Sequence, residues 1–301
     1  MVMLSVKNIS KAYASKQVVD HVSFDIKKGE IFGFLGPNGA GKSTTIEIIA
    51  GLKKKTGGVV TINGKEMTDK DRYNYLGVQL QQAELYGNLT VKETLNLFLS
   101  FHNRKAFIDE HIHLTKLEAF LNQKVKSLSG GQKQRLSLSL SLANDPEILI
   151  LDEPTVGLDP QSRRLLWDII LSLKQKGKTI LLTTHFMDEA QRLCDRVAIM
   201  NEGKLLFVDT VDHLLNQIDK RFSIVIETTP DIYPFLNVEH LSAIIVRDDE
   251  KVVIKTDEID EAFQKVMKQI EENELELKSI VIKEANLEDL FIQLTGKELR
   301  E

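Results

Sequence analysis

A glycine-rich loop near the start of the chain has the residues and the spacing needed to hold phosphate groups. Residues 36–43 read Gly-Pro-Asn-Gly-Ala-Gly-Lys-Ser and fit the pattern G-x-x-x-x-G-K-[ST] without a mismatch. Glycines let the backbone turn successive N–H groups toward a phosphate, and a following helix adds the positive end of its dipole. The loop therefore predicts a phosphate site made by Asn38, Gly39, Ala40, Gly41, Lys42, Ser43 and Thr44. A glycine turn in an unrelated fold is the alternative.

Within this loop two side chains have specific expected tasks. Lys42 is expected to reach the β- and γ-phosphates of a nucleotide, and the Ser43 hydroxyl is expected to ligate Mg²⁺. The context supports both, because an apolar strand-like segment at 31–35 precedes the loop and a helical pattern over 43–52 follows it.

Two carboxylates follow a second apolar segment. Ile148–Leu151 has the composition of a buried strand, and Asp152 and Glu153 come directly after it. Ligand sites of parallel α/β sheets gather at this end of the strands. Asp152 is therefore a candidate for holding magnesium, and Glu153 is a candidate general base for the attacking water. The competing interpretation is a solvated turn.

A third segment, Leu-Ser-Gly-Gly-Gln at 128–132, lies between the loop and the carboxylates. Ser129 and the N–H groups of Gly130 and Gly131 open a helix, so they form a second anion-binding end.

In order and spacing, these motifs resemble those of the ATP-binding subunit of an ABC transporter, over about residues 1 to 215. The resemblance implies that residues 128–132, including Gln132, are a signature that contacts the γ-phosphate bound by a partner chain. It makes Asp152 the magnesium aspartate and Glu153 the catalytic glutamate. It also implies a D-loop containing Asp159 and a switch histidine at His185. A lone histidine near a strand end is otherwise more often structural.

Three further site residues depend on the same resemblance. Gln81 lies 39 residues after Lys42, where the family places a glutamine that contacts the metal and the catalytic site. Gln79 and Gln82 are neighbouring alternatives, and Gln81 is preferred because residues 76–80 have the pattern of a strand. Tyr13 is expected to stack on the adenine, with Val18 packing beside it, although an ordinary core tyrosine would have the same pattern.

The expected fold is α/β. Apolar strands alternating with helices predict a parallel sheet covered on both faces, and a helical insert is expected at about 85–144. The resemblance implies that this is a P-loop NTPase fold with an antiparallel β subdomain. This ABC ATPase domain is expected to cover residues 1–217. Residues 218–301 predict a small accessory α/β domain with the ferredoxin-like order β-α-β-β-α-β and a last helix. Three histidines of the insert (His102, His111 and His113) complete no metal-ligand pattern and are expected on a solvated surface.

Charge and composition limit the possible partners and cellular location of the protein. The net charge is −5, and residues 213–301 carry 20 Asp and Glu against 11 Lys and Arg, which argues against a nucleic-acid partner. Apolar runs of only a few residues predict no membrane span, and the first ten residues predict no secretory signal. One cysteine excludes an internal disulfide. With the resemblance, these features predict a peripheral protein on the cytoplasmic face of the membrane.

The resemblance also indicates partners and a direction of transport. The ending at 286–296 resembles the tail of ABC-2-type exporter ATPases, so the expected function is ATP hydrolysis that powers export through separate membrane permease subunits. A second ATPase subunit is expected, in a homodimer or a heterodimer, with ATP and Mg²⁺ as ligands. The alternatives are a soluble nucleotide switch of repair or translation, or an importer ATPase.

Overall fold

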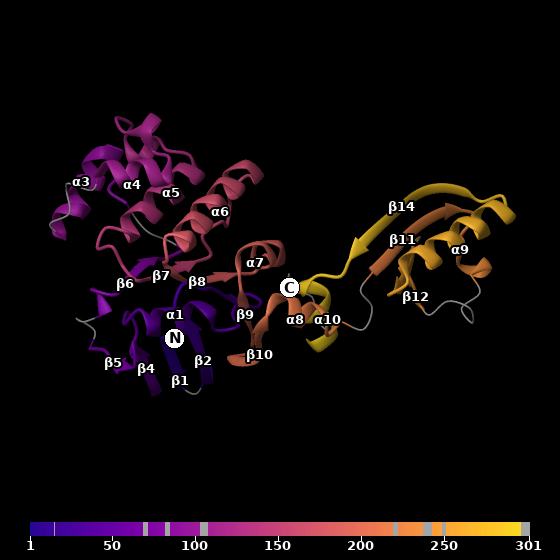
Figure 1. Ribbon diagram of the computed structural model, residues 1–301, viewed down its shortest axis with the longest axis horizontal. Helices are drawn as coiled ribbons and strands as arrows, with labels where there is room; N and C mark the ends of the chain where they lie inside the picture. The colour runs from indigo at the N-terminus through magenta and orange to yellow at the C-terminus, as the bar shows by residue number, and fades with distance from the viewer. Residues whose placement is uncertain are drawn as a thin grey trace. The chain divides into compact units, whose positions relative to one another are not determined.

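The computed structural model describes residues 1–14, 16–68, 72–81, 85–102, 108–218, 222–236, 243–248 and 251–295, and divides the chain into two compact units (Figure 1). The first unit is Met1–Thr210 and the second is Val211–Glu298. Residues 211–217, predicted to belong to the first domain, therefore lie in the second unit. The reason is local: their short helix α8 (Val211–Leu215) lies against α10 (Leu287–Thr295) near the end of the chain.

A six-stranded sheet is the centre of the first unit. Its order is β10-β9-β3-β8-β7-β6, and every neighbouring pair is parallel except β10 with β9. The strands are β3 (Ile31–Leu35), β6 (Leu76–Gln79), β7 (Ile148–Asp152), β8 (Thr179–Thr184), β9 (Arg196–Asn201) and β10 (Lys204–Thr210). The predicted parallel sheet is confirmed, whereas β10 is an addition that the apolar pattern did not reveal because its side chains are only partly buried.

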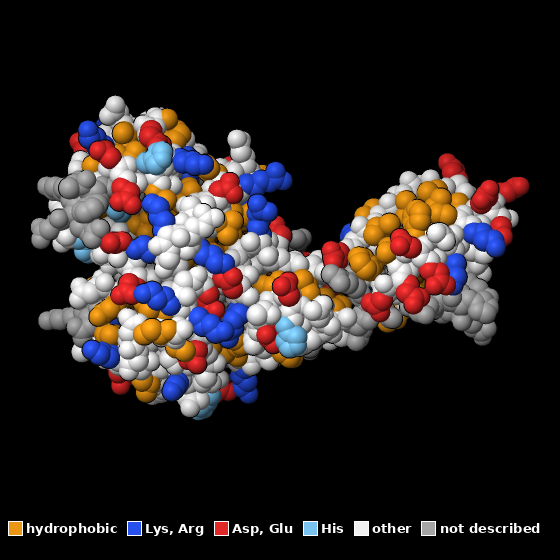
Figure 2. Space-filling view, in the orientation of Figure 1, with side chains coloured by type: hydrophobic (Ala, Val, Ile, Leu, Met, Phe, Trp, Pro, Cys, Tyr) orange, Lys and Arg blue, Asp and Glu red, His pale blue; other side chains and the backbone are white. Residues whose placement is uncertain are grey.

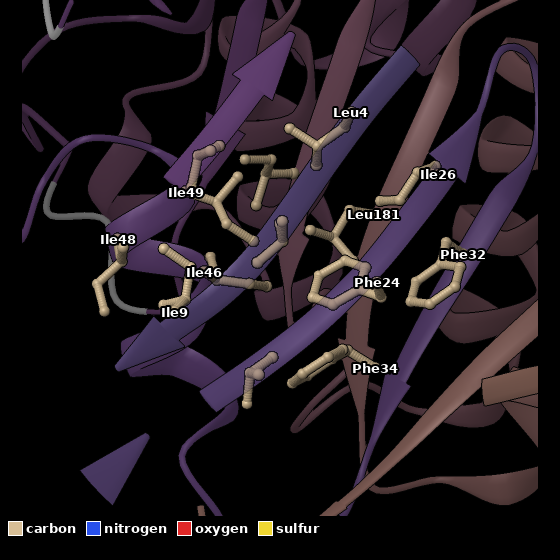
Figure 3. Close-up of a cluster of buried hydrophobic side chains, with 14 of the residues drawn as sticks. Leu4, Ile9, Phe24, Ile26, Phe32, Phe34, Ile46, Ile48, Ile49 and Leu181 are labelled. Carbon is tan, nitrogen blue, oxygen red and sulfur yellow. The ribbon is translucent and has the colours of Figure 1, made fainter. Parts of the chain in front are cut away.

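Helices cover both faces of this sheet, because alternate side chains of each strand point to opposite faces. Ile148 and Ile150 of β7 belong to one core cluster with α1 (Lys42–Ile49), and Leu149 and Leu151 belong to another with α6 (Pro160–Gln175). Figure 3 shows the first cluster, in which Phe24 stacks on Phe32 with ring centroids 5.1 Å apart. Another helix, α7 (Met187–Leu193), follows β8.

An antiparallel sheet of order β2-β1-β4-β5 packs on the first cluster. Its strands are β1 (Val2–Tyr13), β2 (Lys16–Lys27), β4 (Gly57–Ile62) and β5 (Lys65–Glu66). Buried side chains alternate with exposed ones along β2, from Val22 through Phe24 to Ile26. All three strand pairs are antiparallel, which confirms the predicted antiparallel subdomain.

The insert between the two halves of the parallel sheet is helical, as predicted. It contains α3 (Val91–Phe101), α4 (Ile108–Thr115), the 3-10 turns η2 (Glu118–Phe120) and η3 (Val125–Ser127), and α5 (Gly130–Ser141). The solvated surface expected for His111 is wrong, because His111 is buried and its Nδ1 lies 3.1 Å from the carbonyl oxygen of Ser139.

The second unit contains a four-stranded antiparallel sheet of order β12-β13-β11-β14, backed by α9 (Ile259–Glu272). The strands are β11 (Phe222–Thr229), β12 (Ala243–Asp248), β13 (Lys251–Thr256) and β14 (Glu276–Glu284). A single 3-10 turn, η4 (Tyr233–Phe235), occupies the place of the first predicted helix. Asn286 caps α10 by accepting hydrogen bonds from the N–H groups of Glu288 and Asp289. Acidic side chains are prominent on the face of this unit that Figure 2 shows.

Candidate active site

The phosphate loop connects β3 to α1, and its glycines are required by close backbone packing. Gly36 has φ of +152°, and a Cβ there would lie 2.1 Å from the carbonyl oxygen of Met200. Gly41 has φ of +102°, and a Cβ there would lie 2.5 Å from the carbonyl oxygen of Val18. Side chains at either position would push the loop away from β9 or β2, so the loop conformation depends on glycine.

The amine of Lys42 is enclosed by this loop. Its Nζ donates hydrogen bonds to the carbonyl oxygens of Gly36 (2.7 Å) and Pro37 (3.0 Å). It also lies 3.8 Å from Oε1 of Glu153, in an ion pair whose two side chains are both buried. Burial lowers the pKa of Lys42, and the charges of Glu153 and Asp152 oppose that shift.

Asp152, at the end of β7, lies beside the loop as predicted. Its Oδ1 accepts hydrogen bonds from the hydroxyls of Ser43 (3.3 Å) and Thr183. Burial raises the pKa of the Asp152 carboxyl, while these two hydroxyls act in the opposite direction. The Asp152 carboxylate and the Ser43 hydroxyl therefore lie together beside the phosphate loop, and both are hard oxygen ligands.

Glu153 takes a left-handed backbone conformation with φ of +47°, which is costly for a residue with a side chain. Its N–H is held by Thr183, at 2.9 Å from the hydroxyl and 3.2 Å from the carbonyl oxygen. The resulting turn points the carboxylate toward three predicted site residues. Lys42 is one of them, and the other two are Gln81 and His185.

Gln81 and His185 approach Glu153 from different strands. Nε2 of Gln81 donates a 3.0 Å hydrogen bond to Oε2 of Glu153. Nδ1 of His185 lies 3.3 Å from Oε1, close enough for an ion pair but without the direction of a hydrogen bond. Of the alternative glutamines, Gln79 turns away and donates to Oε1 of Gln134 in α5, and Gln82 lies outside the described residues.

The base-binding candidates lie at the antiparallel sheet. Tyr13 ends β1 with 44% of its surface exposed, so its ring is not part of the core. The ammonium groups of Lys11 and Lys53 lie 4.9 and 5.9 Å from the ring centroid. Val18 is partly buried against the core cluster behind the phosphate loop.

The signature segment begins α5 with a reciprocal cap. The N–H of Ser129 donates to Oε1 of Gln132 (2.9 Å), and the N–H of Gln132 donates to the hydroxyl of Ser129 (3.3 Å). The helix thus begins at Gly130, as predicted for a helix opened by Ser129, Gly130 and Gly131. A Cβ on Gly131 would lie 2.6 Å from Oγ of Ser162, so this glycine lets α5 approach α6 closely.

The signature and the phosphate loop lie on opposite faces of the parallel sheet. Leu138 of α5 packs with Leu149 and Leu151, whereas Ile46 and Ile49 of α1 pack with Ile148 and Ile150. Figure 1 shows the two helices on opposite sides of β7 and β8. The predicted site residues therefore form two groups. One surrounds Lys42 and Glu153, and the other consists of residues 129–132 beside α6. Asp159 caps α6, accepting from the N–H groups of Gln161 (3.0 Å) and Ser162 (2.9 Å), which lowers its pKa.

Comparison with known proteins decides the family. Residues 19–156 match the protein family described as ABC transporter. The Nod factor export ATP-binding protein I of Burkholderia orbicola is 37% identical over 308 residues, which cover 98% of this chain and 97% of that protein. The linearmycin resistance ATP-binding protein LnrL of Bacillus subtilis is 35% identical over 316 residues, covering 99% and 100%.

This chain belongs to the ABC transporter family, as an ATP-binding subunit with ATPase activity. Solved structures agree with this assignment. A dimeric ATP-binding cassette in a post-hydrolysis state, bound to ADP and Pi, is 30% identical, with a TM-score of 0.63 over 69% of this chain and 98% of that chain. An ATP-binding subunit of an ABC transporter is 32% identical, with a TM-score of 0.65 over 71% and 92%. Subunits of this kind form dimers and work with membrane permeases.

Sequence reasoning missed two features of the site. Thr183 forms hydrogen bonds with both Asp152 and Glu153. The only sign of this role in the sequence is that Thr183 lies at the end of a buried strand, β8, which pairs with the strand that ends at Asp152. The amide pair of Gln79 and Gln134 ties the signature helix to β6, and nothing local in the sequence indicates it.

Proposed function

We propose that this chain is the ATP-hydrolysing subunit of an exporter, and that two such subunits close around two ATP molecules. The observation that carries the proposal is the division of the site within one chain. Lys42, Ser43, Asp152 and Glu153 gather on one side of the sheet, and the anion-binding end at Ser129 lies on the other. A partner in the reverse orientation would bring its signature to this chain's phosphate loop, in a symmetric pair.

In the proposed reaction, Glu153 orients and deprotonates the attacking water. Its carboxylate is positioned by the backbone turn at Glu153, which Thr183 holds, and by the hydrogen bond from the Gln81 amide. Lys42 stabilises the charge that develops on the transferred phosphoryl group. His185, on the same carboxylate, positions the water and the γ-phosphate. Tyr13 stacks on the adenine with Val18 beneath it.

The residues beside the loop fit Mg²⁺. The Ser43 hydroxyl, the Asp152 carboxylate and the Gln81 side-chain amide are hard oxygen donors, and Mg²⁺ in nucleotide sites takes only one or two carboxylates along with phosphates and waters. In keeping with this, the described part of the chain has no group of three or more His, Cys, Asp and Glu side chains that could hold a metal by itself. When bound, the ion would neutralise charge on the β- and γ-phosphates.

The export role rests on the relatives. The proteins named for Nod factor export and linearmycin resistance match this chain over almost its whole length, including the second unit. No comparable support favours the repair, translation or importer alternatives. The permease is proposed to be of the ABC-2 type, and the subunit to lie on the cytoplasmic face of the membrane. No helix among the described residues is long and apolar enough to cross a bilayer.

A groove of about 540 Å³ is the proposed permease contact. It lies between the segment after β6 and the helical insert, and its lining includes Gln81, Leu85, Lys133 and Leu158. Tyr86, 66% exposed, lies in the chain between Leu85 and Gly87, which both line the groove. A permease element in this groove would touch Gln81, which is bonded to Glu153, and would thereby sense the hydrolytic site.

Co-expression with a candidate ABC-2-type permease tests the proposal. We expect the pair to copurify and to move substrate out of the cytoplasm in an ATP-dependent way, and Lys42→Ala to stop transport while the pair still copurifies. Tyr86→Glu should weaken copurification. A pair that transports equally well with Lys42→Ala would contradict the proposal.

A further inference from the structure

Glu189 is a fully buried carboxyl group in the first turn of α7, four residues after His185. Its Oε1 accepts a 2.8 Å hydrogen bond from Nε1 of Trp167 in α6. Its Oε2 is also buried and has no hydrogen-bond partner. Leucine or methionine would fill the same space without the cost of burying a carboxyl group, so packing alone does not account for glutamate here.

Three segments of the hydrolytic site meet at this carboxyl group. Trp167 belongs to α6, the helix that Asp159 caps. The hydroxyls of Thr184 and Thr155 also lie against Glu189. Thr184 directly precedes His185, and Thr155 is two residues after Glu153. Glu189 therefore joins the segment of the switch histidine to the segment of the general base and to the D-loop helix.

The hydrogen-bonding atoms are complementary if Glu189 is protonated. The hydroxyl oxygen of Thr155 is buried and, like Oε2 of Glu189, has no hydrogen-bond partner. A carboxylic acid can donate from Oε2 to that hydroxyl and keep accepting from Trp167 at Oε1. Burial raises the pKa of Glu189, which favours this protonated form, while the neighbouring side chains of Thr184, Trp167 and Thr155 oppose the shift.

A second contact joins the same two helices. The guanidinium of Arg163 in α6 lies 4.4 Å from the ring centroid of Phe186, and the Phe186 ring lies 4.3 Å from that of His185. The imidazole is thus supported on one side by a stack that begins in α6. Glu189 lies against the hydroxyl of Thr184 in the same segment.

We propose that Glu189 is a positioning residue for ATP hydrolysis, which holds the Thr184–His185 segment in place relative to Glu153 by bonding to Trp167 and Thr155. This inference rests on the proposed roles of Glu153 and His185. Displacing a positioned group by about 1 Å costs up to about 100-fold in rate, so the loss of Glu189 should act on turnover rather than on ATP binding.

The test compares Glu189→Met with Glu189→Gln in the full chain. Methionine has a similar shape without hydrogen bonds, whereas glutamine keeps the acceptor for Trp167 and offers an N–H to Thr155. We expect Glu189→Met to lower kcat by about 10- to 100-fold with the KM for ATP changed less than about 3-fold. Glu189→Gln should stay within about 3-fold of the parent in both values.

Trp167 supplies a second readout, because it is the only tryptophan in the chain. Loss of its indole hydrogen bond in Glu189→Met should shift its emission, and Glu189→Gln should leave the emission close to that of the parent. This spectrum is read without nucleotide, so it does not depend on the roles of Glu153 and His185. Loss of activity in His185→Ala tests those roles separately.

Thr155→Val is the variant to use if Glu189→Met does not fold. It removes the hydroxyl and keeps the shape of the side chain, and it should lower kcat with little change in KM. In the Glu189→Met background, Thr155→Val should lower kcat no further, because both changes remove the same contact between Glu189 and Thr155. A kcat within 2-fold of the parent in Glu189→Met, or in Thr155→Val, would overturn the proposal. So would an equal loss in Glu189→Gln and Glu189→Met.

Discussion

At the scale of single residues, the site places charged groups where water is largely excluded. Lys42, Asp152 and Glu153 are all more than nine-tenths buried, and their pairing offsets only part of the cost of burial. Glu153 adds backbone strain. Such features are typical of sites in which stability is sacrificed for function.

Asp152→Asn should therefore stabilise the free protein. The pKa of Asp152 is raised in the folded state, so folding favours its protonated form, and the ionised form at pH 7 costs stability. Asparagine can still accept from Ser43 and Thr183. We expect the Tm at pH 7 to rise by about 2–4 °C, corresponding to about 1 kcal/mol in a domain of this size.

The pH dependence checks the cause of that gain. It should shrink as the pH falls below the ordinary pKa of aspartate, where Asp152 is protonated in both the folded and the unfolded protein. Thermal unfolding at pH 7 and at about pH 3 measures both values. An unchanged or lower Tm at pH 7 would mean that the bonds to Asp152 outweigh its burial.

Tyr13→Ala should weaken ATP binding by about 5- to 150-fold, the loss expected for base stacking of about 1–3 kcal/mol. Tyr13→Phe keeps the ring and should bind almost as the parent does. Titration with a fluorescent ATP analogue measures both, and Lys65→Ala, an exposed change in β5, is a control for surface effects. Equal affinities for Tyr13→Ala and Tyr13→Phe would exclude stacking as the role of this residue.

At the scale of elements, the signature helix depends on how closely α5 approaches α6. A Cβ on Gly131 would meet Ser162 at 2.6 Å, whereas a Cβ on Gly130 would meet only Leu158, at 3.8 Å. Gly131→Ala should therefore cost about 1–3 kcal/mol of stability, and Gly130→Ala should be nearly neutral. Denaturant unfolding of the two variants provides the comparison. Equal losses would show that the close packing at Gly131 does not control the helix.

Local patterns predicted elements and motifs better than the contacts between them. The loop at 36–43 and the strand before Asp152 are continuous in sequence, so their roles follow from type and spacing. Glycines are poor helix formers, and the cap at Ser129 and Gln132 offsets this, so α5 begins where the Ser-Gly-Gly segment predicted. Glu189 and Thr183 gain their importance from residues distant in the chain, which a single sequence does not bring together.

At the scale of the whole molecule, the two units have separate hydrophobic cores. The core of the second unit is built from β11, β12, β13 and α9, with residues such as Ile224, Ile254 and Val266. The boundary at Thr210 falls after the last strand of the first unit. Cutting the chain there removes no strand of the sheet that holds the phosphate loop.

A chain ending at Thr210 should therefore fold and bind ATP with an affinity within about 3-fold of the full chain, because each domain can fold around its own core. A nucleotide titration and a thermal unfolding curve check this. Complete loss of ATP binding by a folded truncated chain would show that the second unit contributes to the nucleotide site.

The central claim is that two subunits share each ATP, with Glu153 as the general base. Glu153→Gln in Mg²⁺ and ATP tests it most directly, with oligomeric mass measured by light scattering. We predict that turnover falls by about 10²- to 10⁴-fold and that a dimer with two ATP molecules accumulates. Adding Ser129→Arg should keep ATP binding but return the protein to monomers. Monomeric Glu153→Gln protein saturated with ATP would contradict the account.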